Sequence, residues 1–297
     1  MRFDDAFLVS APIRWMAAWG CFWPSFGLFG SALLSLARGN YAAALATHCH
    51  NAQFLPSLSA LIAIYPEKQL WQFSMCMLLS LVLFTCAMLH EYLRRHLASN
   101  VYSFSMRAAL FVCTSAHVVE WLFLALLSFV TSDDSMMWHQ LGFIGFILCH
   151  WVHSGMLLAL QMHMLRHGGA QLPSLGSIVL SATATDSTSK DCAVAFSLRT
   201  LQLRARIICV NIVSFALAAV FYLVHTAHCT PYFYSYFAVC EWFVILLVIL
   251  FHCVMALDLD GSRLAFVLTP DALQSLTTRD AATYGGAAIE IEPLMHR

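Results

Sequence analysis

The chain has 297 residues, of which 60% are hydrophobic and only 10% charged, and its formal net charge is −1. Soluble domains carry about 25% charged residues, so the composition excludes an ordinary soluble domain and indicates a polytopic membrane protein. Without a basic surface there is no sign of nucleic acid as a partner. The polar start MRFDDAF precedes an apolar segment too long for a cleaved signal peptide, so we expect the first span to act as an uncleaved signal anchor.

Six apolar segments are long enough to cross a bilayer, and in lipid their backbone groups must be satisfied within helices. The predicted fold is therefore an all-α membrane protein with six transmembrane helices. Gly20, Pro24, Gly27 and Gly30 interrupt the first segment and predict a kink or close helix packing. The segments are Pro12–Leu36, Leu70–His90, Ala108–Val130, Leu141–Leu165, Ile207–Val224 and Tyr236–Leu257.

The stretch His48–Ile64, between the first two spans, predicts a short interfacial helix. Pro56 breaks it, and about 13 apolar-periodic residues are too few to span a bilayer. We expect the helix to lie on the lumenal membrane surface with its apolar face down. The alternative is a connecting loop that folds back on the bundle. The apolar face consists of Leu58, Leu61, Ile62 and Tyr65.

The basic residues predict the orientation, because cytosolic loops are enriched in Lys and Arg. With both termini in the cytosol, only Arg38 and Lys68 of the 15 Lys and Arg residues are lumenal. Residues 1–260 then form the membrane domain, in which 168–198 is a flexible cytosolic loop. Residues 261–297 are a flexible cytosolic tail.

Of the 11 cysteines, only Cys49 and Cys229 fall in lumenal loops under this topology. Because the lumen is oxidising and the cytosol is not, we predict a disulfide between them.

Several ionisable residues lie within the predicted spans, where they are costly and tend to face a cavity or each other. Glu120 and His153 both fall near the bilayer midplane, where they could pair. One interpretation is structural, with these polar groups joining helices by hydrogen bonds; another is acid–base chemistry on a lipid. The residues are His117, Glu120, His150, His153, Glu241 and His252.

A metal site at the lumenal rim is a third interpretation, because four histidines have H-x-H and H-x-x-H spacings. No H-E-x-x-H or C-x-x-C pattern supports it, so we expect no metal. The rim histidines are His48, His50, His225 and His228.

Several stretches carry a family resemblance in order and spacing. They are ATHCHNAQFLPSLSALIAIYPEKQLWQF, VVEWLFLALLSFVTSDDSMMWHQLGFIGFILCHWVHSGMLL, RIICVNIVSFALAAVFYLVHTAHC and YFYSYFAVCEWFVILLVILFHCVMALDLDG. Together they resemble the post-GPI-attachment group of the Frag1/DRAM/Sfk1 family of membrane proteins. The sequence departs from that pattern at Leu78, Leu81 and Val82, where the family has His, Pro and Arg.

The resemblance implies lipid remodelling of GPI anchors in the Golgi or ER membrane, where a lyso-GPI regains an acyl chain. The implied partners are a GPI lipid or GPI-anchored proteins and the membrane. We expect no bound cofactor, and acyl-CoA is a possible acyl donor. The alternatives are a non-enzymatic membrane organiser resembling the family's autophagy modulators, and a proton-coupled transporter that uses Glu120 and His153.

The predicted site is a lumenal, lipid-accessible cavity covered by the interfacial helix. Its catalytic candidates are carboxylates and histidines, with Glu241 or Glu120 orienting a histidine base. They are Glu120, His139, His153, His225 and Glu241. The lipid-binding candidates are Leu55, Pro56, Ser57, Ser59 and His252.

Overall fold

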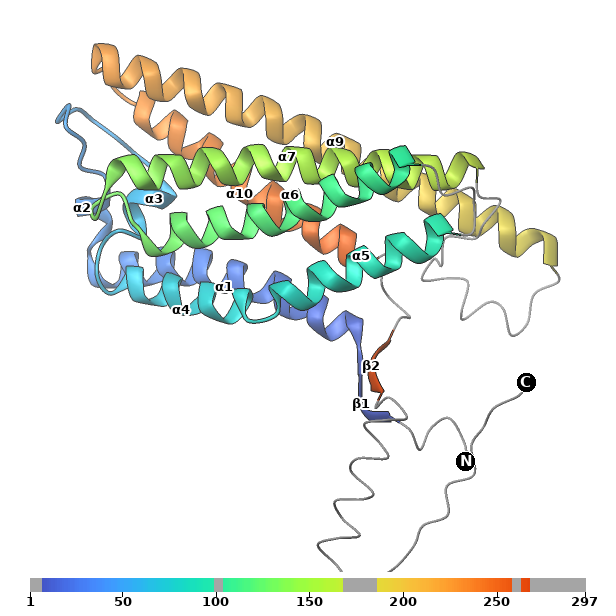
Figure 1. Cartoon of the computed structure of the whole chain (residues 1–297). Helices are drawn as coiled ribbons and strands as arrows, with labels where there is room; N and C mark the ends of the chain where they lie inside the picture. The colour runs from blue at the N-terminus through green and yellow to red at the C-terminus, as the bar shows by residue number, and fades with distance from the viewer. Residues whose placement is uncertain (1–6, 99–103, 168–185, 258–262, 268–297) are drawn as a thin grey trace, which may run out of the picture. The chain divides into compact units, whose positions relative to one another are not determined.

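The computed structural model describes residues 7–98, 104–167, 186–257 and 263–267. Within these ranges, six helical spans are long and apolar enough to cross a membrane, which confirms the predicted all-α, six-span fold (Figure 1). Each span extends beyond its predicted segment at one or both ends, by one to nine residues at an end. They are Ala18–Arg38, Glu67–Glu91, Phe104–Phe129, Met136–Leu165, Leu198–His228 and Phe233–Met255.

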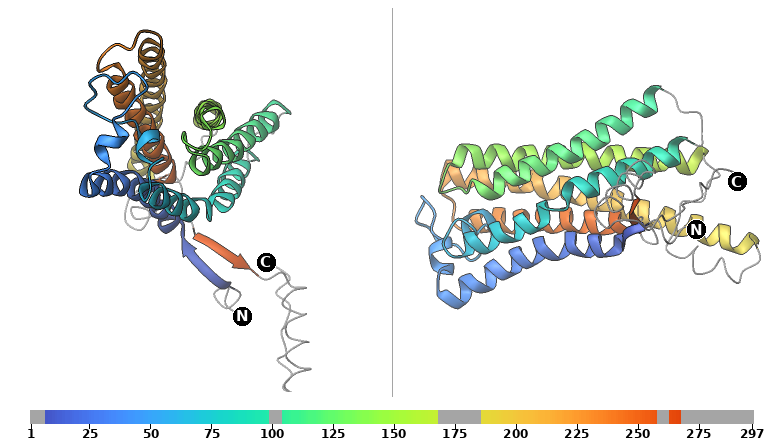
Figure 2. Two further views of the ribbon diagram at one scale, coloured as in Figure 1. Left: turned by 90° about the vertical axis from the view of Figure 1, so that its left-hand side faces the viewer. Right: turned by 60° about the horizontal axis from the view of Figure 1, so that its bottom comes forward.

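The helical part, residues 14–261, forms one compact unit in which the long helices run side by side (Figures 1 and 2). α9 begins inside the predicted loop 168–198, of which residues 168–185 lie outside the described ranges. The helices are α1 Ile13–Arg38, α2 Tyr41–Ala44, α3 Leu58–Leu61, α4 Glu67–Leu79, α5 Val82–Ala98, α6 Phe104–Phe129, α7 Met136–His167, α9 Asp186–His228 and α10 Phe233–Leu257.

A second unit contains a two-stranded antiparallel sheet. Strand β1, Phe7–Pro12, pairs with β2, Arg263–Val267. The predicted tail 261–297 therefore includes one described strand, and residues 268–297 lie outside the described ranges.

The glycines of α1 allow close helix packing, which is one of the two outcomes predicted for them. α1 is continuous through Pro24. A Cβ atom on Gly27 would lie 2.8 Å from the Cβ of Ser74 in α4, and one on Gly30 would lie 3.2 Å from Leu70. α1 and α4 thus approach more closely than side chains at these positions would permit.

The second span consists of α4 and α5, which are separated by a break at Ser80 and Leu81. The carbonyl group of Met77 accepts hydrogen bonds from the Trp19 indole and from the Ser80 hydroxyl, each at 2.7 Å. These donors satisfy a backbone group at the break, as lipid requires. Leu81 is the position at which the family resemblance places a proline, so the break is present here without one.

The predicted helix between the first two spans is α3, and it comprises only four residues. Leu58, Leu61 and Ile62 are buried in the core of the bundle together with Trp71 and Val244. Its apolar face therefore packs into the protein, and the expectation of an apolar face laid on the membrane surface is wrong. A loop that folds back on the bundle, the alternative named above, describes the segment better.

Residues 48–61, here called the strap, are fastened to the beginning of α10. The Ser235 hydroxyl accepts hydrogen bonds from the backbone N–H groups of Phe54 and Leu55, at 2.9 and 3.1 Å. The Trp242 indole donates to the carbonyl of Pro56 at 3.3 Å. Side chains of α10 thereby supply hydrogen-bond partners for backbone groups of the strap that are not paired within a helix.

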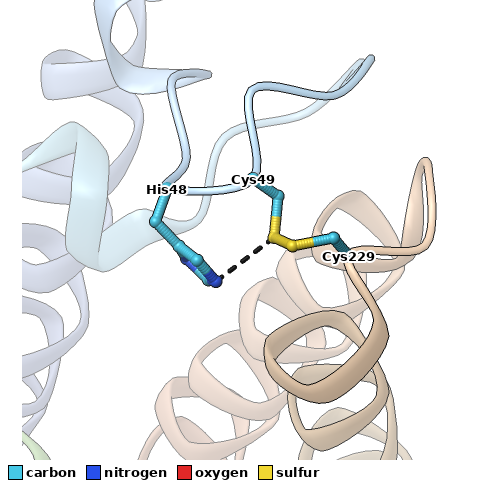
Figure 3. A group of neighbouring side chains, drawn as sticks. All are labelled: His48, Cys49 and Cys229. Atoms are coloured by element: carbon cyan, nitrogen blue, oxygen red, sulfur yellow. Dashed lines mark hydrogen bonds between the residues drawn. A yellow bond between two sulfur atoms is a disulfide. The ribbon is translucent and has the colours of Figure 1, made fainter.

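A disulfide joins Cys49 of the strap to Cys229 at the end of α9, and this is the pair expected from the sequence (Figure 3). The side chain of His48 points toward it, with Nε2 3.2 Å from the Cys49 sulfur. A second disulfide joins Cys21 in α1 to Cys253 in α10. The sequence did not suggest it, because both cysteines lie inside predicted spans.

Counting thiols tests the Cys49–Cys229 bond. In unfolded, non-reduced protein, a Cys49→Ser variant should carry one more maleimide-reactive thiol than wild type, because Cys229 loses its partner. The matched Cys49→Ser/Cys229→Ser double variant should carry the same number as wild type. Mass spectrometry of the labelled chains gives the counts. A single variant with one thiol fewer than wild type would show that the two sulfurs are not bonded.

Candidate functional site

A cavity of about 290 Å³ lies between the strap, α7, α9 and α10. This is close to the lower end of the range for ligand pockets, about 300–1,000 Å³. The strap, α10, the beginning of α7 and α9 all contribute polar groups, whereas Phe143, Ile144 and Phe215 make part of the wall apolar. The polar lining residues are Ser57, Ser59, Ser132, His139, Gln140, Tyr222, Tyr234 and Glu241. The cavity thus offers polar contacts and an apolar surface together, as an amphipathic ligand requires.

The cavity reaches the outer surface of the bundle between α7 and α9. Met136 and Ile144 of α7 line it and are 51% and 48% exposed. Ala219 of α9 also lines it and is exposed. Because exposed apolar residues of a spanning helix face acyl chains, a lipid chain can enter from this side.

Glu241 is buried, and its carboxylate holds the strap. One oxygen accepts a hydrogen bond from the backbone N–H of Leu58 at 2.8 Å. The other accepts from the Ser59 hydroxyl at 2.6 Å and from the Ser59 N–H at 3.4 Å. Within the described ranges no histidine hydrogen-bonds to this carboxylate, so Glu241 does not orient a histidine base there in the way the sequence suggested.

His139 is buried on the cavity wall, and its tautomer is fixed by its neighbour. Nδ1 lies 2.8 Å from the carbonyl oxygen of Val130, which only accepts hydrogen bonds. Nδ1 must therefore carry the proton, and in the neutral ring Nε2 carries a lone pair. Nε2 has no hydrogen-bond partner within the described residues. The lone pair is buried, so Nε2 can act as a general base only toward a group that enters beside it in place of the atoms that now cover it.

The loop before α7, which contains Val130, is fixed to α4. Lys68 donates hydrogen bonds to Asp134, at 2.6 Å, and to the Thr131 hydroxyl, at 3.3 Å. Hydrogen bonds from Lys68 and Thr131 lower the pKa of Asp134 to about 2, so the carboxylate stays charged at any physiological pH. The contact holds the Val130 carbonyl in the position that orients His139.

A smaller cavity of about 50 Å³ adjoins the first and leads into the middle of the bundle. The two share Ser59, Phe143 and Glu241 in their linings. The smaller one also reaches Trp121 of α6 and His252 of α10. It therefore links the cavity beneath the strap with a cluster of polar residues in the membrane interior.

That cluster is organised around Glu120 of α6, which is completely buried. Its Oε1 atom lies 2.9 Å from His150 Nδ1 and 2.9 Å from His252 Nε2, and both nitrogens donate to it. The structure does not form the pair between Glu120 and His153 that the sequence allowed. His153 instead donates from Nδ1 to the carbonyl of Cys113 at 3.1 Å.

The structure separates the predicted catalytic residues into three places. His139 and Glu241 line the larger cavity, and Glu120 and His153 belong to the buried cluster. His225 lies at the disulfide end instead, where its ring contacts His48 and Tyr234 at centroid distances of 5.3 and 5.2 Å.

The predicted lipid-binding residues are divided as well. Ser57 and Ser59 line the larger cavity, and His252 lines the smaller one. Leu55 and Pro56 belong to the strap without lining either cavity. Sequence reasoning missed Tyr234, whose hydroxyl hydrogen-bonds to that of Ser57 at 2.8 Å. Its spacing to Glu241, seven residues or two helical turns, was an available signal.

Removing the Glu241 carboxylate tests its role in holding the strap. Glu241→Ala leaves the buried N–H of Leu58 without an acceptor, at a cost of about 1–3 kcal/mol. The melting temperature of the purified protein in detergent should fall. Ser59→Ala, which removes one donor to the same carboxylate, serves as the control and should lower it less. Equal melting temperatures for Glu241→Ala and wild type would contradict this role.

Comparison with known proteins places these features in a family. The family described as the Frag1/DRAM/Sfk1/Cwh43P N-terminal domain matches residues 12–262. A Drosophila melanogaster protein named Post-GPI attachment to proteins factor 2 is 27% identical over 84% of this chain and 88% of its own length. The protein of that name from Caenorhabditis elegans is 25% identical over 89% of this chain and 92% of its own length. A Danio rerio protein named Acyltransferase PGAP2 is 27% identical over 48% of this chain and 60% of its own length. No solved structure matches.

Proposed function

We propose that this protein, which belongs to the Frag1/DRAM/Sfk1/Cwh43p family, acts in the lipid remodelling of GPI anchors, at the step that returns an acyl chain to a lyso-GPI. The names of the relatives support this pathway. The observation that carries the proposal is the larger cavity, which combines polar groups under the strap with an apolar wall open between α7 and α9. A lyso-GPI has the same division between a phosphoinositol head and an acyl chain.

His139 is the residue best placed to act as the general base. In this step the free glycerol hydroxyl of the lyso-GPI attacks the carbonyl carbon of an acyl thioester such as acyl-CoA. Nε2 of His139 takes the hydroxyl proton, the C–S bond breaks, and the thiolate leaves and receives the proton. One ester bond forms for the thioester bond lost. The printed name of the Danio rerio relative, which includes "Acyltransferase", supports this chemistry.

The strap end of the bundle faces the lumen of the Golgi or the ER in this proposal, and both termini are cytosolic. The Cys49–Cys229 disulfide supports the orientation, because such bonds persist in oxidising compartments. Two acyl chains anchor a protein firmly whereas one binds only marginally. Loss of the protein should therefore release GPI-anchored proteins from the cell surface.

Filling the cavity tests whether it holds the lipid. In cells that lack their own version of this factor, wild type should restore two-chain anchors on a GPI-anchored reporter, measured by mass spectrometry of its lipid. Ala219→Trp places a large side chain in the cavity mouth and should leave the lyso form. Ala216→Trp, also at an exposed position of α9 but outside the cavity lining, is the matched control and should restore two chains. Equal restoration by both variants at equal protein levels would contradict the lipid site.

The His139→Asn variant tests the catalytic step. Asparagine retains an N–H donor near the position of Nδ1, for the Val130 carbonyl, and lacks Nε2. We expect normal protein level and melting temperature but persistent lyso-GPI, because the base is gone. A variant that restores two-chain anchors as well as wild type would show that His139 is not the base and that this protein supports acyl transfer by binding the lipid.

A further inference from the structure

The buried cluster in the middle of the bundle has the composition of a metal site. His117 and Glu120 of α6 and His252 of α10 each offer one ligand atom, and these three atoms lie within 4.8 Å of one another. His117 and Glu120 are completely buried, and the side chain of His252 is 14% exposed. Two imidazoles and one carboxylate are a ligand set used by catalytic zinc sites.

Each of these residues also has a polar atom without a partner. Glu120 Oε2, His117 Nε2 and His252 Nδ1 have no hydrogen-bond partner within the described residues. A buried polar atom without a partner costs about 1–3 kcal/mol, and such atoms in native proteins require an explanation. The three atoms belong to the residues that can each bring a ligand atom within 4.8 Å of the others, so a cation bound by these residues accounts for all three. His150 Nε2 and His153 Nε2 of the same cluster also have no partner within the described residues.

We propose that His117, Glu120 and His252 bind a divalent transition-metal ion, most readily Zn²⁺. The proposal goes beyond the lipid remodelling argued above and does not depend on it. Neutral imidazole and carboxylate ligands suit Zn²⁺. The ion also supplies a positive charge beside Glu120, whose hydrogen-bond partners in the described part of the chain are both histidines.

Neighbouring groups already orient the ligands as the outer partners of a metal site do. His150 donates to Oε1 of Glu120, which leaves Oε2 for the ion. His117 Nδ1 lies 3.5 Å from the sulfur of Cys86, which leaves Nε2. His252 donates from Nε2 to Glu120, so in the neutral ring Nδ1 carries the lone pair.

The smaller cavity provides a route to the site, because it leads from Glu241 under the strap to His252. The rim does not offer an equivalent site. His48, Cys49 and Cys229 are close enough to hold an ion, but the two sulfurs are bonded to each other and are not thiolates. Sequence spacing pointed to the rim histidines. The buried ligands instead lie on α6 and α10, and Glu120 and His252 are 132 residues apart in the sequence.

Metal analysis of the purified protein, made without a polyhistidine tag and dialysed against Zn²⁺, tests the proposal. Inductively coupled plasma mass spectrometry should give about one zinc ion per chain. His117→Asn and Glu120→Gln should reduce the content to that of a mock preparation. His150→Asn should weaken the affinity roughly tenfold or more. His90→Asn is the matched control, because His90 contacts Thr114 of α6 outside the cluster, and it should retain the ion.

Measurements on wild type alone keep the proposal testable where a variant fails to fold. A chelator should lower the melting temperature and Zn²⁺ should restore it. Co²⁺ should bind in place of Zn²⁺ with visible absorption bands of an N/O-ligated ion. The proposal is wrong if wild type binds no zinc, or if His117→Asn and Glu120→Gln retain as much as His90→Asn. A melting temperature that depends on pH but not on metal would assign the cluster to proton transfer instead.

Discussion

Non-helical backbone that enters a membrane bundle must find hydrogen-bond partners inside the protein, and the strap meets this requirement through α10. Ser57 and Leu58 are buried, yet the strap forms only four residues of helix. The N–H groups of Phe54 and Leu55 donate to the side chain of Ser235, and that of Leu58 donates to Glu241. The larger cavity exists because the strap is held in this position, with its own serines forming part of the polar wall.

The two buried glutamates illustrate how the same side chain serves different ends. Both oxygens of Glu241 accept hydrogen bonds, so its role is to position the strap. Only one oxygen of Glu120 accepts hydrogen bonds, and the other has no partner within the described residues. Burial is alike at the two positions. The number of donors that the surrounding backbone and side chains provide distinguishes them.

Apolar segment length predicted the six spans, and cysteine placement together with orientation pointed to the pair Cys49 and Cys229.

The partner of Glu120 was not predictable in this way, because His150 and His153 share one helix face. The choice between the two histidines depends on how α7 packs against α6 at two glycines of α7. A Cβ on Gly142 would lie 2.9 Å from the Leu127 backbone nitrogen, and one on Gly145 would meet Phe123. This antiparallel register of α6 and α7 sets His150 level with Glu120 and His153 about one turn farther along.

The same register accounts for the separation between the larger cavity and the buried cluster. His139 begins α7 beside the strap, and His150 lies eleven residues later, about 16 Å along the helix axis. A lipid head at the level of His139 therefore does not reach Glu120, and the smaller cavity past Glu241 is the connection between them. Among the buried atoms without a hydrogen-bond partner in the described part of the chain, Nε2 of His139 lies at one end of this route and Nδ1 of His252 at the other. Our two proposals accordingly place chemistry on a lipid at the first end and binding of an ion at the second.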